Sequence, residues 1–300
     1  MAEFRFPGKT NFDEARMTRW EARDRTIRAA GDPIPGVMGI VNITPDSFSD
    51  GGRSLSAAAA AEHARGLIQQ GADLLDLGAE STRPGSDPVP LEEELRRLLP
   101  VLEDLGSEIA VPLSIDTSKA RVAELALARG ASIINDVTAL RGDPDMVRVV
   151  ADSGAAVVLM HMLGTPRIMQ DDPRYDDVVS DVLRFLAGRI DWCESHGIPR
   201  SRIAIDPGIG FGKTFEHNLQ LLRNLKRFAN LGCTLLVGTS RKGLLGTLTG
   251  RDMSERAVAS VVSALAACVG GAQVVRVHDV AAMVDAIKVW TRIWGWGHSS

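Results

Sequence analysis

Three polar side chains stand where short apolar segments end: Asp116 closes VPLSID, Asn135 lies in SIIND and Asp206 closes RIAID. A carboxylate accepts hydrogen bonds from two adjacent N–H groups, and a carboxamide offers one acceptor and a donor group. Together the three side chains suit the amino-pyrimidine edge of a heterocycle. Asp and Asn also cap helices, and this alternative stays open for Asp116. It is weaker for Asp206, because PGIGFG separates that residue from the next helical segment.

Cationic side chains gather near the end of the chain. Arg241 and Lys242 follow the segment TLLVG, and Arg276 and His278 lie two residues apart in RVHDV. Residues two apart on a strand project to the same side, so Arg276 and His278 predict an anion-binding surface. A core histidine with satisfied ring nitrogens remains the alternative for His278.

The segment NITPDSFSDGG offers oxygen ligands in Asn42, Asp46 and Asp50. Mg²⁺ prefers such ligands and shares them with substrate phosphates, so a shared Mg²⁺ and diphosphate site is expected here. The six His form neither HxH nor HExxH, and no metal cage made by the protein alone is expected. DPGIGFGKT is not a P-loop, because Pro207 stands where that motif needs Gly, and it is not GxGxxG. ATP and NAD sites are therefore not expected.

These groups need a scaffold, and residues 36–296 supply a regular one. Short apolar, β-branched runs alternate with Ala- and Leu-rich helical segments, of which 57–71 ends at a Gly as helices commonly do. The apolar runs cover residues 37–43, 72–78, 111–116, 131–136, 155–160, 202–206, 234–238 and 273–277. Eight strand–helix units predict a parallel (β/α)₈ TIM barrel, an α/β fold, more readily than an open doubly wound sheet.

The polar motifs all follow predicted strands, and the strand starts carry nothing comparable. In a barrel the carboxyl ends of the strands converge on one mouth, where active sites lie. Clusters of Gly, Pro, Asp and Ser are also ordinary turn chemistry. Because eight such turns fall on one side only, an enzyme is predicted.

Residues 1–35 differ in composition from this single domain, and we expect them to form an amphipathic helix or a strap whose Trp20 docks on the barrel. The chain has 34 Lys and Arg against 38 Asp and Glu, which excludes a protein that coats nucleic acid. It lacks an apolar run near the ~20 residues of a membrane span, and its first residues lack a signal-peptide core. The three Cys lie too far apart for a CxxC zinc site or a disulfide framework. A cytoplasmic protein is expected, with neither nucleic acid nor a membrane as partner.

Seven motifs, taken in order, resemble those of the dihydropteroate synthases in the pterin-binding barrel superfamily: NITPDSFSDGG, ESTRPG, IDTSK, IND, DPGIGFGKT, GTSRKG and RVHD. The resemblance runs from residue 36 to residue 288 and implies the same barrel fold. It implies a transferase of folate biosynthesis, the enzyme that sulfonamides target. Such an enzyme joins 6-hydroxymethyl-7,8-dihydropterin diphosphate to 4-aminobenzoate, with Mg²⁺, and yields 7,8-dihydropteroate and pyrophosphate.

The resemblance also implies residue roles. Asn42 corresponds to a Mg²⁺ ligand, and the set that reads the pterin corresponds to Asp116, Asn135, Asp206 and, in the pocket wall, Met160.

On the other side of the implied site, Lys242 corresponds to a lysine between pterin and aminobenzoate, Ser240 to a residue at the aminobenzoate carboxylate and Phe211 to the apolar wall. Arg276 and His278 correspond to diphosphate ligands. Catalytic roles are thereby implied for Asp116, Lys242, Arg276 and His278.

Thr82 and Arg83 correspond to the family's mobile second loop, and Gly243 departs from a Ser that many relatives carry after SRK. Two alternatives to the synthase remain. A corrinoid methyltransferase would share the pterin-reading set but would not need the cationic groups, and a non-catalytic pterin-binding paralogue would lose a loop or Lys242. The small residues of AVASVVSALAACVGG predict either close packing of a helix on the barrel or a homodimer contact.

Overall fold

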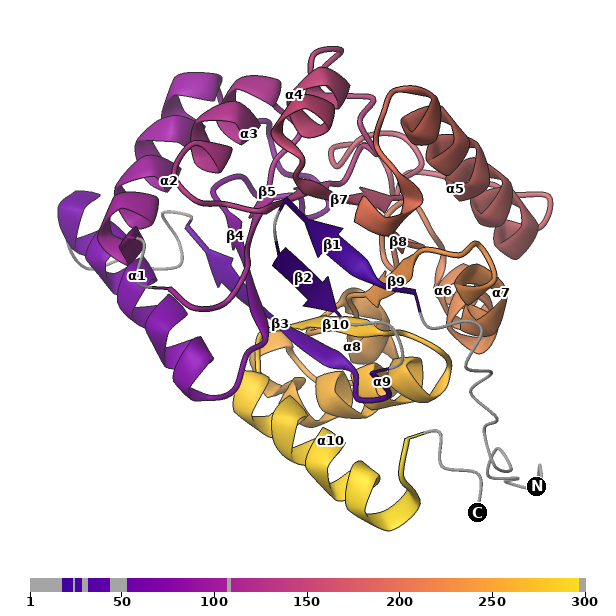
Figure 1. The fold of residues 1–300 in the computed structure, drawn as a ribbon. Coiled ribbons are helices and arrows are strands. Elements are labelled where there is room, and N and C mark those ends of the chain that lie inside the picture. Colours follow the sequence, from indigo (N-terminus) through magenta and orange to yellow (C-terminus); the bar gives the residue numbers. More distant parts are fainter. Residues whose placement is uncertain (1–17, 24, 29–31, 44–52, 107–108, 297–300) are drawn as a thin grey trace, which may run out of the picture.

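The structure is a computed structural model that describes residues 18–23, 25–28, 32–43, 53–106 and 109–296. Eight parallel strands close into a barrel in the order β10-β3-β4-β5-β6-β7-β8-β9, and helices surround it (Figure 1). The predicted (β/α)₈ barrel is confirmed. Its strands are β3 (Gly36–Asn42), β4 (Leu74–Gly78), β5 (Leu113–Asp116), β6 (Ile133–Asp136), β7 (Ala156–Met160), β8 (Ile203–Asp206), β9 (Thr234–Val237) and β10 (Val274–Val277).

The helices cover the outer faces of the strands, which are therefore buried on both sides and read as continuous apolar runs. One helical segment, residues 215–232, is interrupted at Asn224, where the backbone leaves the helical region and the side chain Nδ2 donates to Gln220 O (2.8 Å). No helix in the described parts of the chain is long and apolar enough to cross a membrane. The helices are α1 (Arg53–Gln69), α2 (Leu91–Leu105), α3 (Ala120–Leu127), α4 (Met146–Ser153), α5 (Val178–Ser195), α6 (Phe215–Arg223), α7 (Leu225–Ala229), α8 (Gly243–Thr249), α9 (Ala257–Val269) and α10 (Val280–Trp294).

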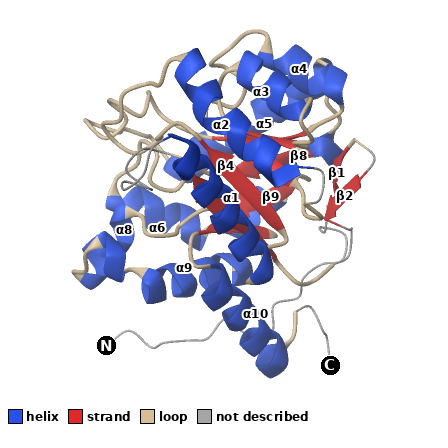
Figure 2. Cartoon of the chain, turned by 90° about the vertical axis from the view of Figure 1, so that its left-hand side faces the viewer, coloured by secondary structure: helices blue, strands red, loops and turns tan. Residues whose placement is uncertain are grey.

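The described part of the N-terminal extension is an antiparallel hairpin of β1 (Trp20–Ala22) and β2 (Arg25–Arg28). Of the two expectations for the extension, the helix is wrong for these residues: Trp20 and Ala22 are buried, and Glu21 between them falls on the other face, which is the two-residue period of a strand. Residues 1–17 lie outside the described residues. The hairpin covers one end of the barrel (Figures 1 and 2).

The docking of Trp20 on the barrel is confirmed. The indole is fully buried, its Nε1 donates to Arg202 O (3.3 Å), and it packs in one cluster with the inward-facing side chains of the strands. Met38, Leu74 and Ile133 are among them. The hairpin therefore completes the core at the end of the barrel where the strands begin.

Replacing Trp20 with Ala is expected to lower the free energy of unfolding by about 3–5 kcal/mol, the usual cost of deleting a buried indole. Urea unfolding of both proteins at one concentration measures the difference. Ile34→Ala, at a position that is 46% exposed near the same end of the barrel, is the control and should cost about 0.5 kcal/mol or less. A loss of unfolding free energy in Trp20→Ala as small as that in Ile34→Ala would show that the indole of the hairpin does not stabilise the core.

Candidate active site

The register of the strands brings the predicted residues to the other end of the barrel in two sets, with Asn135 paired to Val158, two residues before Met160. Asn42 on β3 pairs with Gly78 on β4, Gly78 with Asp116 on β5, and Asp116 with Asn135 on β6. Across β7 and β8, Met160 pairs with Asp206. The carboxyl ends of the strands therefore place these side chains around one mouth, as the sequence predicts.

Asp76, a residue that the sequence analysis missed, is the centre of a buried network. Its carboxylate accepts hydrogen bonds from Arg276 Nε (2.6 Å), Asn135 Nδ2 (3.1 Å) and Ser114 Oγ (2.6 Å). Arg276 Nη2 also donates to Asp116 Oδ2 (3.1 Å). One guanidinium thus joins two buried carboxylates and the amide of Asn135 into a single unit. The only signal in the sequence is an Asp in the middle of the apolar strand LLDLG.

Burial and like charge set the protonation of this network. Burial raises the pKa of Asp116 to about 8, with the charge of Asp76 adding to the effect and Arg276 opposing it. Burial disfavours the Arg276 guanidinium, but the two carboxylates outweigh this and raise its pKa. At neutral pH the cluster therefore holds a permanent cation and a carboxyl group that can donate or accept.

On the opposite strands, Asp206 and Lys242 form the second part of the mouth. Asp206 is buried and accepts a hydrogen bond from Gly208 N (2.7 Å), and burial raises its pKa while the charge of Lys242 opposes the rise. Lys242 Nζ donates to Ile209 O and stands 4.7 Å from the centre of the Phe211 ring. Burial lowers the pKa of Lys242 to about 8. The structure thus brings together the predicted Asp206, Lys242 and Phe211.

The Gly-rich segment after β8 packs directly against the backbone of the loop after β7. Gly208 and Gly212 have φ of +69° and +64°, and a Cβ on either would come within 2.0 Å of His161 O or 2.6 Å of Leu163 O. A side chain at either position would collide with the backbone that follows β7, so only Gly allows the two loops to meet. This contact carries the Phe211 ring to its place over Lys242.

Ser240 and His278 lie at the ends of β9 and β10. The Ser240 hydroxyl is 3.0 Å from His278 Nδ1 and accepts from His278 N (3.2 Å). Burial, reinforced by Arg276 and Arg241, lowers the pKa of His278 to about 3. The ring is therefore neutral without a bound anion, so the predicted cationic cluster has one charge fewer than its residue types suggest. Arg241 is paired with Asp279 (2.6 Å).

The loop after β4 carries the predicted Thr82 and Arg83. The single O–H of Ser86 lies within hydrogen-bond distance of Ser81 O (2.6 Å) and Arg83 O (2.7 Å), which makes a tight turn. Gly85 N donates to Pro166 O (3.0 Å) in the loop after β7. Thr82 is half-buried and Arg83 exposed. The charge of Arg83 contributes to the lowered pKa of His278, so this loop lies at the same mouth.

Metal ligands are sparse around the mouth. Among the residues that the structure describes, no group of three or more His, Cys, Asp or Glu could hold a metal ion. Asn42 is half-buried at the end of β3 and offers one amide oxygen, which fits an Mg²⁺ ion that takes its other ligands from a diphosphate and water. The other two predicted oxygen ligands, Asp46 and Asp50, lie outside the described residues.

Comparisons with known proteins agree with this geometry. Residues 38–278 match the family described as "Pterin binding enzyme". The dihydropteroate synthase of Escherichia coli (strain K12) is 45% identical over 85% of this chain and 90% of that protein, and that of Neisseria meningitidis serogroup C is 48% identical over 85% and 92%. The structure of Xanthomonas albilineans dihydropteroate synthase with 4-aminobenzoic acid superposes with a TM-score of 0.85 at 50% identity, covering 92% of this chain and 98% of that one.

A closed barrel whose mouth holds an acid–amide–guanidinium network defines a pterin-binding enzyme. The chain belongs to this family and, within it, to the dihydropteroate synthases.

Proposed function

We propose that the mouth of the barrel catalyses the condensation of 6-hydroxymethyl-7,8-dihydropterin diphosphate with 4-aminobenzoate. The aniline nitrogen forms a bond to the exocyclic methylene carbon, the carbon–oxygen bond to the diphosphate breaks, and the aniline loses a proton. The observation that carries the proposal is the network of Asp76, Asp116, Asn135 and Arg276 facing the pair Asp206 and Lys242. Xanthomonas albilineans dihydropteroate synthase, an enzyme of this family, has been solved in complex with 7,8-dihydropteroate.

The pterin ring is read by Asp116, Asn135 and Asp206, with Met160 in the pocket wall. Asp76 accepts from Asn135 Nδ2 and so orients the amide, which leaves Asn135 Oδ1 as the acceptor for a ring N–H. Gly208 N takes one acceptor position of Asp206, and a carboxylate has about four. Asp206 can therefore still accept from two adjacent N–H groups. Met160 belongs to a small apolar cluster with Met162, suited to a flat ring.

Lys242, Ser240 and Phe211 receive 4-aminobenzoate. The ammonium of Lys242 lies over the Phe211 ring, so an aromatic acid entering beside that ring meets an apolar face and a cation together. Ser240 adds a hydroxyl from the neighbouring strand end. The mobile-loop residues Thr82 and Arg83 cover this side of the mouth and keep water from the reacting carbon.

Turnover at limiting 4-aminobenzoate is expected to fall as pH rises through about 8, because the amine of Lys242 then loses the charge that holds the aminobenzoate carboxylate. The pH profile of kcat/KM for 4-aminobenzoate measures this loss. Lys242→Arg keeps its charge throughout that range, so its kcat/KM for 4-aminobenzoate should not fall above pH 8. If kcat/KM of this variant still falls above pH 8, the ionisation belongs to Asp116, whose pKa is also about 8.

Arg276, His278 and Asn42 assist the departure of pyrophosphate. Stabilising the charge that develops on a leaving group is commonly worth several kcal/mol. A bound diphosphate places negative charge beside His278 and opposes the burial that keeps its ring neutral, so Nε2 can hold a proton toward the leaving group. Asn42 would hold the Mg²⁺ ion, which neutralises the diphosphate when bound.

Asn42→Ala is expected to abolish the strengthening of pyrophosphate binding by Mg²⁺ while leaving the affinity for the plain pterin unchanged within about twofold. The reason is that the metal's one protein ligand among the described residues is lost, whereas the pterin-reading side chains stay. Calorimetric titration with and without Mg²⁺ measures both affinities. An equal response to Mg²⁺ in wild type and variant would remove Asn42 from the metal site.

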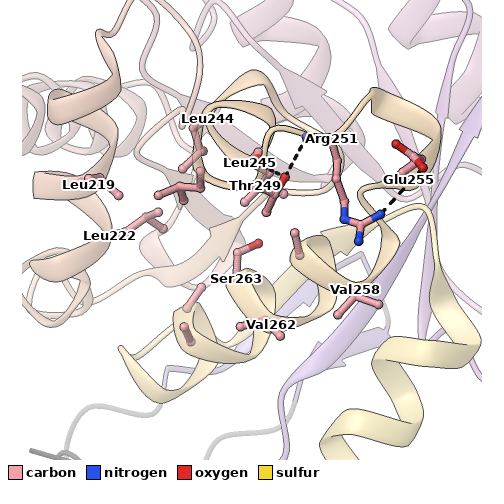
Figure 3. A pocket seen from close by; sticks show the side chains of 14 residues that line it. Leu219, Leu222, Leu244, Leu245, Thr249, Arg251, Glu255, Val258, Val262 and Ser263 are labelled. Carbon is pink, nitrogen blue, oxygen red and sulfur yellow. Dashed lines mark hydrogen bonds and ion pairs between the residues drawn. The ribbon is translucent and has the colours of Figure 1, made fainter. Parts of the chain in front are cut away.

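We also propose that two copies of the chain pair through an apolar groove between α8 and α9 (Figure 3). Leu248, Val258 and Val262 are 56%, 77% and 61% exposed there, an unusual degree for apolar side chains that lie together. Arg251 and Glu255 line the same groove, so its rim carries both signs of charge (Figure 3). A two-fold contact pairs such a surface with itself, apolar side chains against apolar side chains, and leaves the Arg251–Glu255 ion pair of each copy (3.7 Å) at the rim.

Sedimentation velocity tests the dimer with the intact chain. The wild type is expected to sediment as a dimer and Val262→Glu as a monomer, because the new charge would be buried without a partner. Arg121→Glu, on the exposed face of α3 far along the barrel, is the matched control and should remain dimeric. A monomeric wild type would overturn the proposal.

A cytoplasmic location is the last part of the proposed function. Its support is the state of the cysteines: Cys193, Cys233 and Cys268 are free thiols buried in the core, as in a protein that folds in a reducing compartment.

A further inference from the structure

Lys213, the lysine of DPGIGFGKT, has no part in the roles above and yet is almost completely buried. Its Nζ lies 2.9 Å from Phe211 O, 3.2 Å from His161 O and 3.0 Å from His161 Nδ1. None of these three partners is a carboxylate. A lysine that is buried among neutral acceptors is costly for the fold, so its position calls for a reason other than stability.

The surroundings of Lys213 Nζ fit a hydrogen-bond donor that faces three acceptors. Burial lowers the pKa of His161 to about 3, with the charge of Lys213 acting in the same direction, so the ring is neutral and accepts at Nδ1. An ammonium group has three N–H donors, and here it meets three acceptors. Burial lowers the pKa of Lys213 well below its ordinary value; the charge of Asp206 opposes that shift and the charge of Lys242 adds to it.

These hydrogen bonds join two segments of the mouth. His161 directly follows Met160 at the end of β7, and this end is held independently by the sheet, since His161 N donates to Asp206 O (3.0 Å). Phe211 belongs to the Gly-rich loop, which has no such ladder. Loss of the Lys213 contacts would therefore shift the loop at Phe211 and leave the strand in place.

We propose that Lys213 is a positioning residue for 4-aminobenzoate. It holds the carbonyl of Phe211 against the end of β7, and thereby fixes the Phe211 ring against the Lys242 ammonium. His161 serves as the neutral acceptor that makes a buried ammonium tolerable at this point. The inference rests on the proposed roles of Phe211 and Lys242 in binding the second substrate.

The loop has other anchors, which limit the size of the effect. Gly210 N donates to Asn218 Oδ1 (2.6 Å), and Tyr175 OH donates to Gly212 O (2.7 Å). At the surface, Gln170 Nε2 donates to Gly210 O (2.7 Å). Removal of Lys213 should therefore displace the Phe211 ring rather than unfold the loop.

The test is steady-state kinetics of Lys213→Met, which keeps the length of the side chain and removes its donors. KM for 4-aminobenzoate is expected to rise about tenfold or more, because a small displacement of a binding group is enough for such a loss. The dissociation constant for the pterin, measured by calorimetry, should stay within about twofold. Gln170→Ala removes an exposed anchor of the same loop and is the matched control, with both constants expected within about twofold.

Variants of His161 separate positioning from folding. His161→Asn keeps an acceptor near the position of Nδ1 and should behave as wild type, whereas His161→Leu should reproduce Lys213→Met. The double variant Lys213→Met with His161→Leu should be no worse than either single change, because both remove the same contact.

The inference would be overturned if Lys213→Met weakened binding of 4-aminobenzoate and of the pterin equally, or changed neither. It would also be overturned if both Lys213→Met and His161→Leu failed to fold, because the contact would then be structural only. A wild-type protein without turnover would instead refute the proposed function.

Discussion

Asp206→Asn is expected to weaken binding of the pterin substrate about 100-fold and to change binding of 4-aminobenzoate less than about threefold. The carboxylate is buried at the mouth, and Gly208 N takes only one of its acceptor positions. Asn replaces one acceptor oxygen with a donor, which then faces a ring N–H. Each buried donor left unpaired costs about 1–3 kcal/mol, so two adjacent N–H groups account for the loss.

Calorimetric titration with each substrate separately measures the two affinities. The remaining Oδ1 of the Asn side chain can still accept from Gly208 N, so the loop is expected to keep its path. Asp152→Asn, on the exposed surface of α4, is the control for loss of one carboxylate and should leave both affinities unchanged. Unchanged pterin affinity in Asp206→Asn would remove this residue from the site.

Arg276→Met is expected to lower kcat/KM about 1,000-fold. Two losses combine in this variant. The leaving group loses a cation, which is worth about 3–4 kcal/mol in comparable sites. Asp76 and Asp116 lose their shared partner, and because Arg276 holds the pKa of Asp116 down, that pKa will rise further above 8. Most of the loss should therefore appear in kcat at saturating substrates.

Pyrophosphate release under steady-state conditions measures the effect of Arg276→Met. Arg241→Met is the matched control, because Arg241 is also half-buried near the mouth and, among the residues that the structure describes, its guanidinium pairs with one carboxylate, that of Asp279. Arg241→Met should lower kcat/KM less than about tenfold. Equal losses in the two variants would show that the mouth requires positive charge in general and that the network around Asp76 has no particular role.

The barrel and its mouth could be predicted because each strand is one apolar run closed by a polar motif. The pattern of neighbours along the sequence is enough to place Asp116, Asn135 and Asp206 at strand ends. The hairpin could not be predicted in this way. Strands of three and four residues show too few alternations of apolar and polar side chains to stand out in a charged segment that is also compatible with a helix.

Asp76 could not be found from the sequence because its partner is far away in the chain. Arg276 lies 200 residues further on, and the two meet only because β10 closes the barrel against β3, the neighbour of β4. The sequence offers no role for Lys213, because DPGIGFGKT is not a P-loop and only the packing of two loops brings its Nζ to His161. The neutral state of His278 likewise depends on burial, which residue type does not report.

The most direct test of the central claim is a product assay with the purified 300-residue chain. The protein is incubated with 6-hydroxymethyl-7,8-dihydropterin diphosphate, 4-aminobenzoate and Mg²⁺, and pyrophosphate and 7,8-dihydropteroate are quantified together. We expect the two products to form in equal amounts, and 7,8-dihydropteroate to require both substrates. Tight binding of the pterin without any 7,8-dihydropteroate would contradict the account and favour a pterin-binding protein of another function.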